Sequence, residues 1–248
     1  MFARLFVALA TLSIAACSSQ PLRPDPRDPL EKFNRTMYTM NDALDRAIAR
    51  PAARTYRRIT PTVVQTGVSN FWSNATYPST IVNQFLQGKP REGLSDLGRF
   101  VLNTVAGVGG LFDPATAAGL DKNDEDFGQT LAKWGVRSGP YLMLPLLGPS
   151  SLRDGVGKVP DRFVDPVHYV DDWRWQWGLD GLRLLERRAR LLPATDTLKD
   201  VYDPYSFIRN VWFQQRDYAI HDGNVAPPPA DAELFPDDAD EAAQAPPP

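Results

Sequence analysis

The stretch that decides the fold is GKPREGLSDLGRFVLNTVAGVGGLFD, residues 88–113. Pro90 suits the first turn of a helix, and apolar residues recur after it at helical spacing. These residues are Leu94, Leu97, Val101, Val105 and Val108. The opposite face of the same helix carries Asp96, Arg99 and Asn103. The pattern predicts an amphipathic helix that runs into a glycine-rich turn.

The second half of this stretch, residues 100–112, has thirteen residues without an ionisable side chain. A helix that crosses a bilayer needs about 20 apolar residues, so this segment is too short to span one. Two interpretations stay open: a buried core helix ended by a glycine turn, or a hairpin that enters lipid part of the way. In the second interpretation, the residues of the membrane hairpin or gate are Phe100, Val101, Val105, Gly107, Gly109, Gly110, Leu111 and Phe112.

The N-terminus indicates the environment that the chain meets. Arg4 precedes an apolar run that ends in small residues and in Cys17, the only cysteine of the chain. This pattern predicts a cleaved secretory signal peptide over residues 1–16. Residues 14–17 resemble a bacterial lipobox, in which the cysteine is lipidated and becomes the mature N-terminus. An ordinary signal peptide with a chance cysteine is the alternative. Because Ser18 follows rather than aspartate, the resemblance to enteric lipoproteins implies sorting to the outer membrane.

Composition divides the remaining chain into a tether, a body and a tail. Residues 17–27 form a short lipidated tether, and residues 28–221 are long enough for one domain with its own core. Residues 222–248 hold seven acidic residues, seven prolines and no basic residue, so we expect a disordered tail. The mature chain without this tail has 26 basic and 23 acidic residues. It has no basic stripe with interleaved aromatics, which argues against nucleic-acid binding.

The body has the pattern of many short helices punctuated by proline. Asp28 is expected to cap the first helix, which Pro51 interrupts. Separate helices are expected after Thr60-Pro61 and after Tyr77-Pro78. Asp-Pro pairs at residues 113, 165 and 203 mark further helix starts. Strand-like alternation is scarce, and Asp154-Gly155 is expected to lie in a loop. We therefore predict an all-α single domain.

No motif points to a reaction, a cofactor or a metal site. His168 and His221 are far apart in the sequence, and neither has a second ligand at metal spacing. Residues 121–126 look like the start of a calcium loop, but Asp126 and Ala132 stand where an EF-hand needs glycine and glutamate. Nucleophile-elbow, Walker and zinc-protease motifs are absent. We therefore do not expect an enzyme.

A second group of residues fits a membrane interface. Three tryptophans fall within five residues, and tryptophan favours the level of the lipid headgroups. The helix expected after them has arginines beside an apolar side, which is typical of helices that bind anionic surfaces. The candidates are Trp173, Trp175, Trp177, Arg183, Arg187 and Arg190. A core helix with a solvated arginine edge is the alternative. The apolar, proline-broken run over residues 141–147 is also expected to be exposed.

A series of short motifs runs in order through the body, from about residue 28 to about residue 220. The motifs are Asp28-Pro29-Leu30-Glu31-Lys32-Phe33-Asn34-Arg35, Val82-Asn83 with Leu86-Gln87-Gly88, Arg99-Phe100 with Asn103-Thr104 and Gly109-Gly110, Asp126-Phe127-Gly128-Gln129-Thr130-Leu131, Gly139-Pro140-Tyr141 with Leu144-Pro145, Arg153-Asp154, and Asp203-Pro204-Tyr205. Taken together, they resemble the MlaA (VacJ) family of outer-membrane lipoproteins. Lipidation at Cys17 fits the same family.

The resemblance implies a helical disc or ring, lipid-anchored in the periplasmic-facing leaflet of the outer membrane. Such proteins associate with trimeric porins and let mislocalised phospholipids leave the outer leaflet through an amphipathic channel. The lipids pass to a periplasmic carrier, MlaC, for retrograde transport, which maintains the lipid asymmetry of the outer membrane. The resemblance implies no enzymatic activity.

A polar lining is expected for such a channel, because a headgroup in hydrocarbon loses its hydration. The candidate lining residues are Asp96, Arg99, Arg153, Asp154 and Asp161. For each of them a surface ion pair is the alternative. A structural lipoprotein that binds and stabilises porins without transporting lipid is the alternative function.

Overall fold

The structure is a computed structural model that describes residues 25–196 and 201–225. Its elements are α2 (Glu31–Leu44), η2 (Asp45–Ala49), α3 (Arg50–Ile59), α4 (Thr62–Leu86), α5 (Pro90–Val105), α6 (Pro114–Ala117), α7 (Phe127–Lys133), β1 (Tyr141–Leu144), β2 (Gly148–Ser151), α8 (Leu152–Val164), η3 (Pro166–Tyr169), α9 (Trp173–Asp196) and α10 (Pro204–Ile220). The predicted all-α class is confirmed, with one two-stranded sheet as an addition. The signal peptide, Cys17 and tail residues 226–248 lie outside the described residues.

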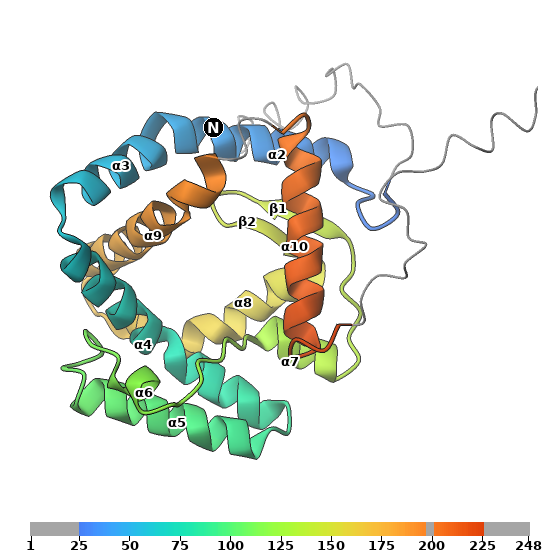
Figure 1. Cartoon of the computed structure of the whole chain (residues 1–248). Coiled ribbons are helices and arrows are strands. Elements are labelled where there is room, and N and C mark those ends of the chain that lie inside the picture. Colours follow the sequence, from blue (N-terminus) through green and yellow to red (C-terminus); the bar gives the residue numbers. More distant parts are fainter. Residues whose placement is uncertain (1–24, 197–200, 226–248) are drawn as a thin grey trace, which may run out of the picture.

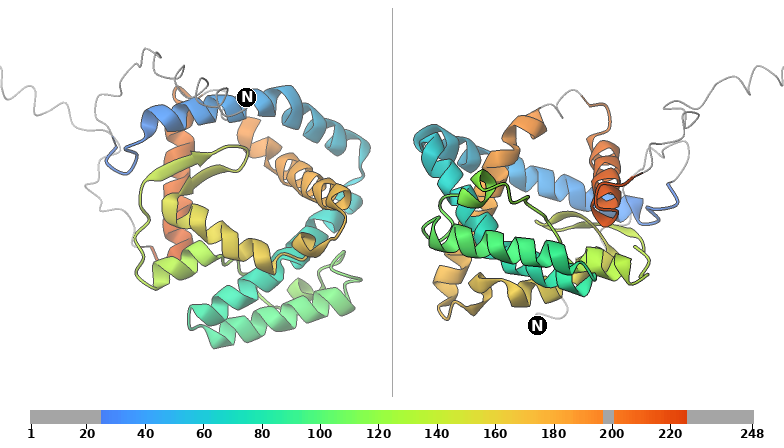
Figure 2. Two further views of the ribbon diagram at one scale, coloured as in Figure 1. Left: turned by 180° about the vertical axis from the view of Figure 1, so that it is seen from behind. Right: turned by 60° about the horizontal axis from the view of Figure 1, so that its bottom comes forward.

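The helices are arranged in a ring (Figure 1). The sides of the ring are formed by α2 with α3, by α4, by α8 with α7, and by α10, and α9 runs beside α3. The hairpin of β1 and β2 lies on the inner side of α2, and α5 packs along α4 outside the ring. The left view in Figure 2 shows the same ring from behind, with α5 outside it beside α4, and in the right view α5 lies in front.

The apolar faces of several helices point outward. On α5, Val101 and Val105 are 50% and 76% exposed, whereas Asp96 on the opposite face is fully buried. The interpretation of residues 100–112 as a buried core helix is therefore wrong. The polar face of α5 packs against α4 and the segment that follows, and this leaves the apolar face uncovered. Large apolar side chains are also exposed on other helices: Phe33, Leu44 and Ile48, then Val63, Val64, Val82 and Phe85, then Val156, Val159 and Phe163.

Two helix breaks expected at proline are absent. The prediction of a separate helix after Tyr77-Pro78 is wrong, because α4 continues through Pro78. Near this proline the hydroxyl of Thr76 donates to the carbonyls of Trp72 and Ser73 in the preceding turn. Pro51 lies in the first turn of α3, and the helical backbone runs into it directly from the π-helical η2.

Residues 141–147 form a strand and its turn rather than a uniformly exposed run. Tyr141 pairs with Ser151 and Leu144 with Gly148 in the antiparallel hairpin of β1 and β2. Tyr141 and Met143 are buried against α10, so only the turn after β1 is exposed. The expectation of a loop at Asp154-Gly155 is also wrong. Both residues lie in α8, where the Ser151 side chain caps the helix by accepting from the Asp154 amide.

The Asp28 carboxylate closes the ring instead of capping a helix. Leu30 stands at the N-cap of α2 and makes no side-chain cap bond. The buried Asp28 carboxylate accepts hydrogen bonds from Asn34 Nδ2 at 2.8 Å, from Arg209 Nη1 at 3.0 Å and from the Tyr205 hydroxyl. Since Tyr205 and Arg209 belong to α10, this one side chain joins the first described helix to the last.

Asn34 extends this junction to the sheet. Its Nδ2 also donates to the Tyr141 carbonyl at 3.0 Å, and its Oδ1 accepts from the Met143 amide at 2.9 Å. The backbone of β1 is thereby fixed to α2 by a fully buried amide. Beside it, Arg35 makes a bidentate ion pair with Asp203 at the start of α10.

The Asp28→Ala variant should be less stable than the wild type. It leaves the Tyr205 hydroxyl without a partner and leaves Arg209 with only the longer contacts to Asp25 (3.5 Å) and Glu31 (3.9 Å). Removing one partner of a buried charge pair costs roughly 3 kcal/mol. Unfolding of the purified protein in detergent, followed by circular dichroism, measures the change. The exposed Asp171, which has no side-chain bond among the described residues, supplies the control, Asp171→Ala. Equal unfolding midpoints for the two variants would contradict the role of Asp28.

The glycine turn after α5 should tolerate no side chain at Gly110. This residue has a φ of 89°, and a Cβ there would lie 2.5 Å from the Asn74 Cβ of α4. Gly110→Ala should therefore cost about 2 kcal/mol, from backbone strain together with overlap. A Cβ added at Gly98, in the middle of α5, would meet no atom within 4 Å, so Gly98→Ala should stabilise the helix by about 0.5–1 kcal/mol. The same unfolding measurement tests both variants. If Gly110→Ala and Gly98→Ala changed the free energy of unfolding in the same direction, the result would contradict the geometry.

Candidate functional site

Asp96 and Arg99, two of the candidate lining residues, hold the polar face of α5 in place. The buried Asp96 carboxylate accepts from the Tyr77 hydroxyl at 2.7 Å, from Gln84 Nε2 at 3.1 Å and from Asn123 Nδ2 at 3.0 Å. Burial, together with the bond to Asp96, raises the pKa of Tyr77. The Arg99 guanidinium donates to the Leu120 carbonyl, to Asp113 and to Thr116, so it fixes the segment around α6.

Asp161 joins three helices in a similar way. Its carboxylate accepts from Ser79 Oγ at 2.7 Å and from Asn83 Nδ2 at 3.1 Å, both on α4, and from the Phe127 amide at the start of α7. Asn83 in turn accepts from Thr130 Oγ1 at 2.7 Å. These bonds fix α4, α7 and α8 to one another.

Arg153 and Asp154 belong to a buried charge network with α10. Arg153 Nε donates to Asp154 at 2.9 Å, and Arg216 donates to Asp154 at 2.8 Å and to Asp126 at 2.7 and 2.8 Å. Burial alone would lower the pKa of Arg216, but the bonds to Asp126 and Asp154 raise it. The five candidate lining residues thus have structural partners, and their role in lining a passage stays a prediction.

The candidate hairpin residues lie at the outer edge of the ring. Val101, Val105, Gly109, Leu111 and Phe112 are exposed, Phe100 is half-buried, and Gly107 and Gly110 are buried in the turn. The outer face of α5 is a shallow apolar groove of about 650 Å³, lined by Leu94, Leu97, Gly98, Val101, Leu102, Val105 and Ala106. Their contact with lipid stays a prediction.

The aromatic and basic candidates on α9 differ in their surroundings. Trp173, Trp175 and Trp177 are exposed, at 65%, 70% and 72%. Arg183 instead pairs bidentately with Asp165, and Arg190 lies near Ser69 and Glu186. Further along the helix, Ala189 and Leu192 pack against Ala53 of α3. Arg183 and Arg190 thus have protein partners, and a role of the three arginines at a membrane interface stays a prediction.

Arg187 points toward a cavity that the sequence did not indicate. This cavity, here called the Lys122 cavity, has a volume of about 610 Å³. Its walls come from the segment before α7, from α7, from α9 and from α10. The lining residues are Lys122, Asn123, Asp124, Glu125, Asp126, Gln129, Arg187, Trp212, Gln215, Arg216, Tyr218, Ala219, Asp222 and Gly223.

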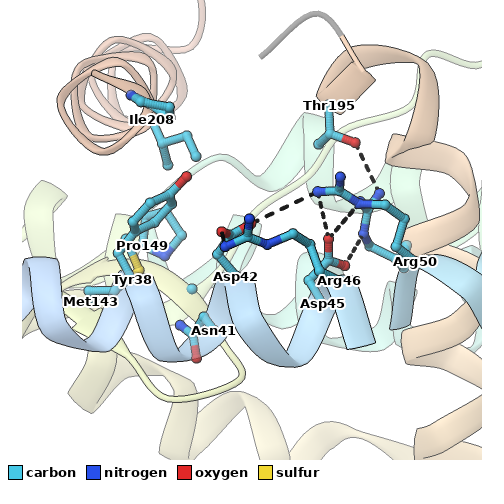
Figure 3. A pocket seen from close by; sticks show the side chains of 13 residues that line it. Tyr38, Asn41, Asp42, Asp45, Arg46, Arg50, Met143, Pro149, Thr195 and Ile208 are labelled. Carbon is cyan, nitrogen blue, oxygen red and sulfur yellow. Dashed lines mark hydrogen bonds and ion pairs between the residues drawn. The ribbon is translucent and has the colours of Figure 1, made fainter. Parts of the chain in front are cut away.

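A second cavity, here called the Tyr38 cavity, has a volume of about 470 Å³. The lining residues are Tyr38, Asn41, Asp42, Asp45, Arg46, Arg50, Met143, Gly148, Pro149, Arg188, Thr195, Pro204 and Ile208. In Figure 3 the apolar side chains of Tyr38, Met143, Pro149 and Ile208 gather on one side and the charged side chains on the other. The wall of the cavity is therefore amphipathic.

The charges of the Tyr38 cavity are paired with one another. Asp45 accepts from Arg188 and from Arg50 at 3.1 Å, and Arg46 lies 2.6 Å from Asp42. Burial would raise the pKa of Asp45, but the two arginines outweigh it and hold that pKa below its usual value. Each charged side chain of this wall thus has an oppositely charged partner, with three arginines against two aspartates.

The two cavities follow one another along the inner faces of α9 and α10. On α10, Pro204 and Ile208 line the Tyr38 cavity, and Trp212, Arg216 and Ala219 line the Lys122 cavity. Residues three or four positions apart share one helix face, so this is a single stripe. On α9 the adjacent Arg187 and Arg188 line one cavity each. The stripe mixes apolar and charged residues, which is why hydrophobic periodicity did not reveal it.

Membrane spans and metal clusters are both absent from the part of the chain that the structure describes. Within residues 25–196 and 201–225, no helix is long and apolar enough to cross a membrane. Over the same ranges, no group of three or more His, Cys, Asp or Glu side chains could hold a metal ion.

Several known proteins are similar to this ring in sequence. The profile of the family described as MlaA lipoprotein matches residues 26–219. "Intermembrane phospholipid transport system lipoprotein MlaA" of Escherichia coli (strain K12) is 38% identical over 226 residues, which cover 89% of this chain and 90% of the relative. The protein of the same name in Haemophilus influenzae is 29% identical over 246 residues, covering 94% and 95% of the two chains.

A solved structure from work on the "structural basis for maintenance of bacterial outer membrane lipid asymmetry" is also similar. It has a TM-score of 0.70 and 40% sequence identity, and the match covers 78% of this chain and 98% of that chain. The sequence and structure comparisons agree over the ring described above. Because the family profile spans almost the whole body, the chain belongs to the MlaA lipoprotein family.

Proposed function

We propose that this chain is an outer-membrane lipoprotein that carries phospholipid headgroups through the interior of its ring, out of the outer leaflet and toward the periplasm. The relatives named as components of a phospholipid transport system support the substrate class. The observation that carries the proposal is that the amphipathic Tyr38 cavity and the polar Lys122 cavity follow one another along α9 and α10 inside a ring with an apolar exterior.

The exterior of the ring suits the hydrocarbon of one leaflet. Apolar surface in water is unfavourable by about 25 cal/mol per Å², and large contiguous patches mark interaction sites. The exposed side chains Leu94, Val101 and Val105 on α5 form such a patch, and Trp173 and Trp175 suit the headgroup level. The ring would therefore lie within the periplasmic-facing leaflet, anchored through Cys17.

The interior of the ring suits a headgroup. A phosphate or ammonium group that enters hydrocarbon loses its hydration at a cost of several kcal/mol, and a polar wall offsets that cost. The Tyr38 cavity offers charged side chains on one side and Tyr38, Met143 and Ile208 on the other. An amphipathic lipid could thus keep its headgroup on the charged wall and its glycerol and upper chain on the apolar wall.

The partners belong to the same proposal. A trimeric porin would hold the ring at the correct depth, and the periplasmic carrier MlaC would receive the lipid. Both follow from the family resemblance. Movement toward the periplasm needs no energy source in the ring if the carrier binds the lipid more tightly than the membrane does. The candidate lining residues Asp96, Arg99, Arg153, Asp154 and Asp161 would act by fixing the helices that form the walls.

Filling the passage should abolish transport. Ala219 borders the Lys122 cavity, so Ala219→Trp would place an indole in the open space without displacing core atoms. In a strain that lacks the gene, the wild type should remove phospholipid from the outer leaflet, and Ala219→Trp should leave it there. Surface phospholipid is measured by labelling intact cells.

The matched control is Ala52→Trp, at an exposed alanine on α3, which should restore asymmetry like the wild type. Restoration by both variants would place the passage elsewhere. Restoration of porin levels alone, with surface phospholipid unchanged by the wild type, would instead support a structural lipoprotein.

A charge on the outer face of α5 should disturb function without disturbing folding. Val105 is 76% exposed, so Val105→Asp removes little packing. Aspartate in lipid costs about 3 kcal/mol, so the hairpin should no longer sit in the leaflet and rescue of lipid asymmetry should fail. Val105→Thr has nearly the same shape without the charge and should rescue. The free energies of unfolding of the two purified variants should agree within about 0.5 kcal/mol. Full rescue by Val105→Asp would exclude lipid contact at this face.

A further inference from the structure

Three charged side chains of the Lys122 cavity have no ion partner. These are the Lys122 ammonium, the Arg187 guanidinium and the Asp124 carboxylate, and among the described residues none of them has an oppositely charged atom within 4.0 Å. All other acidic and basic side chains that line the cavity are paired. Glu125 and Asp222 bind Lys89, and Asp126 binds Arg216.

The three unpaired groups belong to one electrostatic site. All three line the same cavity, and the positive charges of Lys122 and Arg187 favour the charged form of Asp124 without touching it. Desolvation and the neighbouring Asp126 act more strongly in the other direction, so the pKa of Asp124 is raised overall. Desolvation likewise lowers the pKa of Lys122. Solvent reaches Lys122 and Asp124, yet protein surrounds them on several sides, as expected in a concave site.

The Tyr38 cavity provides the contrast. Each of its arginines and aspartates is already bound to an oppositely charged side chain, so a ligand charge would compete with an existing pair there. In the Lys122 cavity two cations and one anion have no oppositely charged partner among the described residues. A ligand that supplies one anionic and one cationic group would pair all three without breaking a bond.

We propose that Lys122, Arg187 and Asp124 form a subsite for a zwitterionic phosphoethanolamine headgroup, with the phosphate between Lys122 and Arg187 and the ammonium at Asp124. This inference rests on the proposed function and names the headgroup class that its passage prefers. Charge-assisted hydrogen bonds hold each end of the headgroup. The ammonium is the part that an anionic phosphatidylglycerol lacks, and without it Asp124 stays unpaired beside the phosphate.

The cavity wall provides further groups for such a ligand. The amide side chain of Gln215 and the indole of Trp212 line the same space, as does Asn123, whose Nδ2 is bound to Asp96. An ammonium group near an aromatic face gains further stabilisation. The volume of about 610 Å³ is within the range of small-molecule sites, so the headgroup has room with its water.

Binding of short-chain lipids to the full-length protein tests the subsite. The probes are dihexanoyl phosphatidylethanolamine, dihexanoyl phosphatidylglycerol and inorganic phosphate, each added below micellar concentration to protein in an uncharged detergent and followed by isothermal titration calorimetry. The wild type should bind the ethanolamine lipid about tenfold more tightly than the glycerol lipid, since one charge-assisted bond differs. Phosphate alone should bind more weakly than either.

The variants assign the two ends of the headgroup. Asp124→Asn should remove the preference between the two lipids by improving the binding of phosphatidylglycerol. Lys122→Gln and Arg187→Gln should each weaken both lipids about tenfold. Asp121→Asn and Lys32→Gln alter exposed charges outside the cavity and should bind like the wild type. Since the three subsite side chains have no ion pairs to lose, unfolding midpoints should stay unchanged.

The outcomes separate this inference from the proposed function. Equal affinity of the wild type for the two lipids, or phosphate binding as tight as that of the ethanolamine lipid, would overturn the zwitterion subsite. Variants that bind like the controls would overturn it as well. Each of these three results is compatible with rescue of lipid asymmetry. Rescue together with such a result would show that the ring transports lipid without a headgroup preference. A selective site in a protein that rescues no asymmetry would instead remove the transport proposal.

Discussion

The ring depends on one constraint: a polar group taken out of water must find a partner inside the protein. An unpaired buried amide or hydroxyl costs about 1–3 kcal/mol, and an unpaired charge costs more. Asp28, Asp96 and Asp161 each meet this constraint by accepting bonds from several elements at once. These carboxylates hold the helices together where a soluble domain would use a larger apolar core, and the apolar clusters that do exist are small.

Because polar bonds hold the helices together, their apolar faces can stay exposed on the outside of the ring. If Asp96 and Arg99 secure the inner face of α5, then Val101 and Val105 need not pack against protein. In water such a surface is a liability, whereas in hydrocarbon it is matched to its solvent. The buried polar bonds also gain strength in a medium of low dielectric constant, since water no longer competes for the same donors and acceptors. A helix with its polar face buried and its apolar face exposed is what the proposed position of the ring in a leaflet requires.

The positions of most helices could be predicted from the sequence, but which face of each helix is buried could not. Periodicity assigned Leu94, Val101 and Val105 to one face and Asp96 to the other, and Asp-Pro pairs marked true helix starts at residues 114, 166 and 204. A stripe of apolar residues looks the same whether protein or lipid covers it, so a core helix could not be excluded. The helix break predicted at Pro78 is absent, because α4 continues through it and packs against α5. Asp28 looked like a helix cap because its partners, Tyr205 and Arg209, lie at the other end of the chain.

The interior shows why some charges are paired and others are not. Asp154 and Arg216 are withdrawn from solvent, so each would be costly alone, and each has a partner. Lys122 and Asp124 lie in a cavity that water enters, where an unpaired charge keeps enough hydration to be tolerated. Folding therefore places little demand on these two side chains. They stay available within one concave space, which is the condition that the proposed headgroup subsite needs.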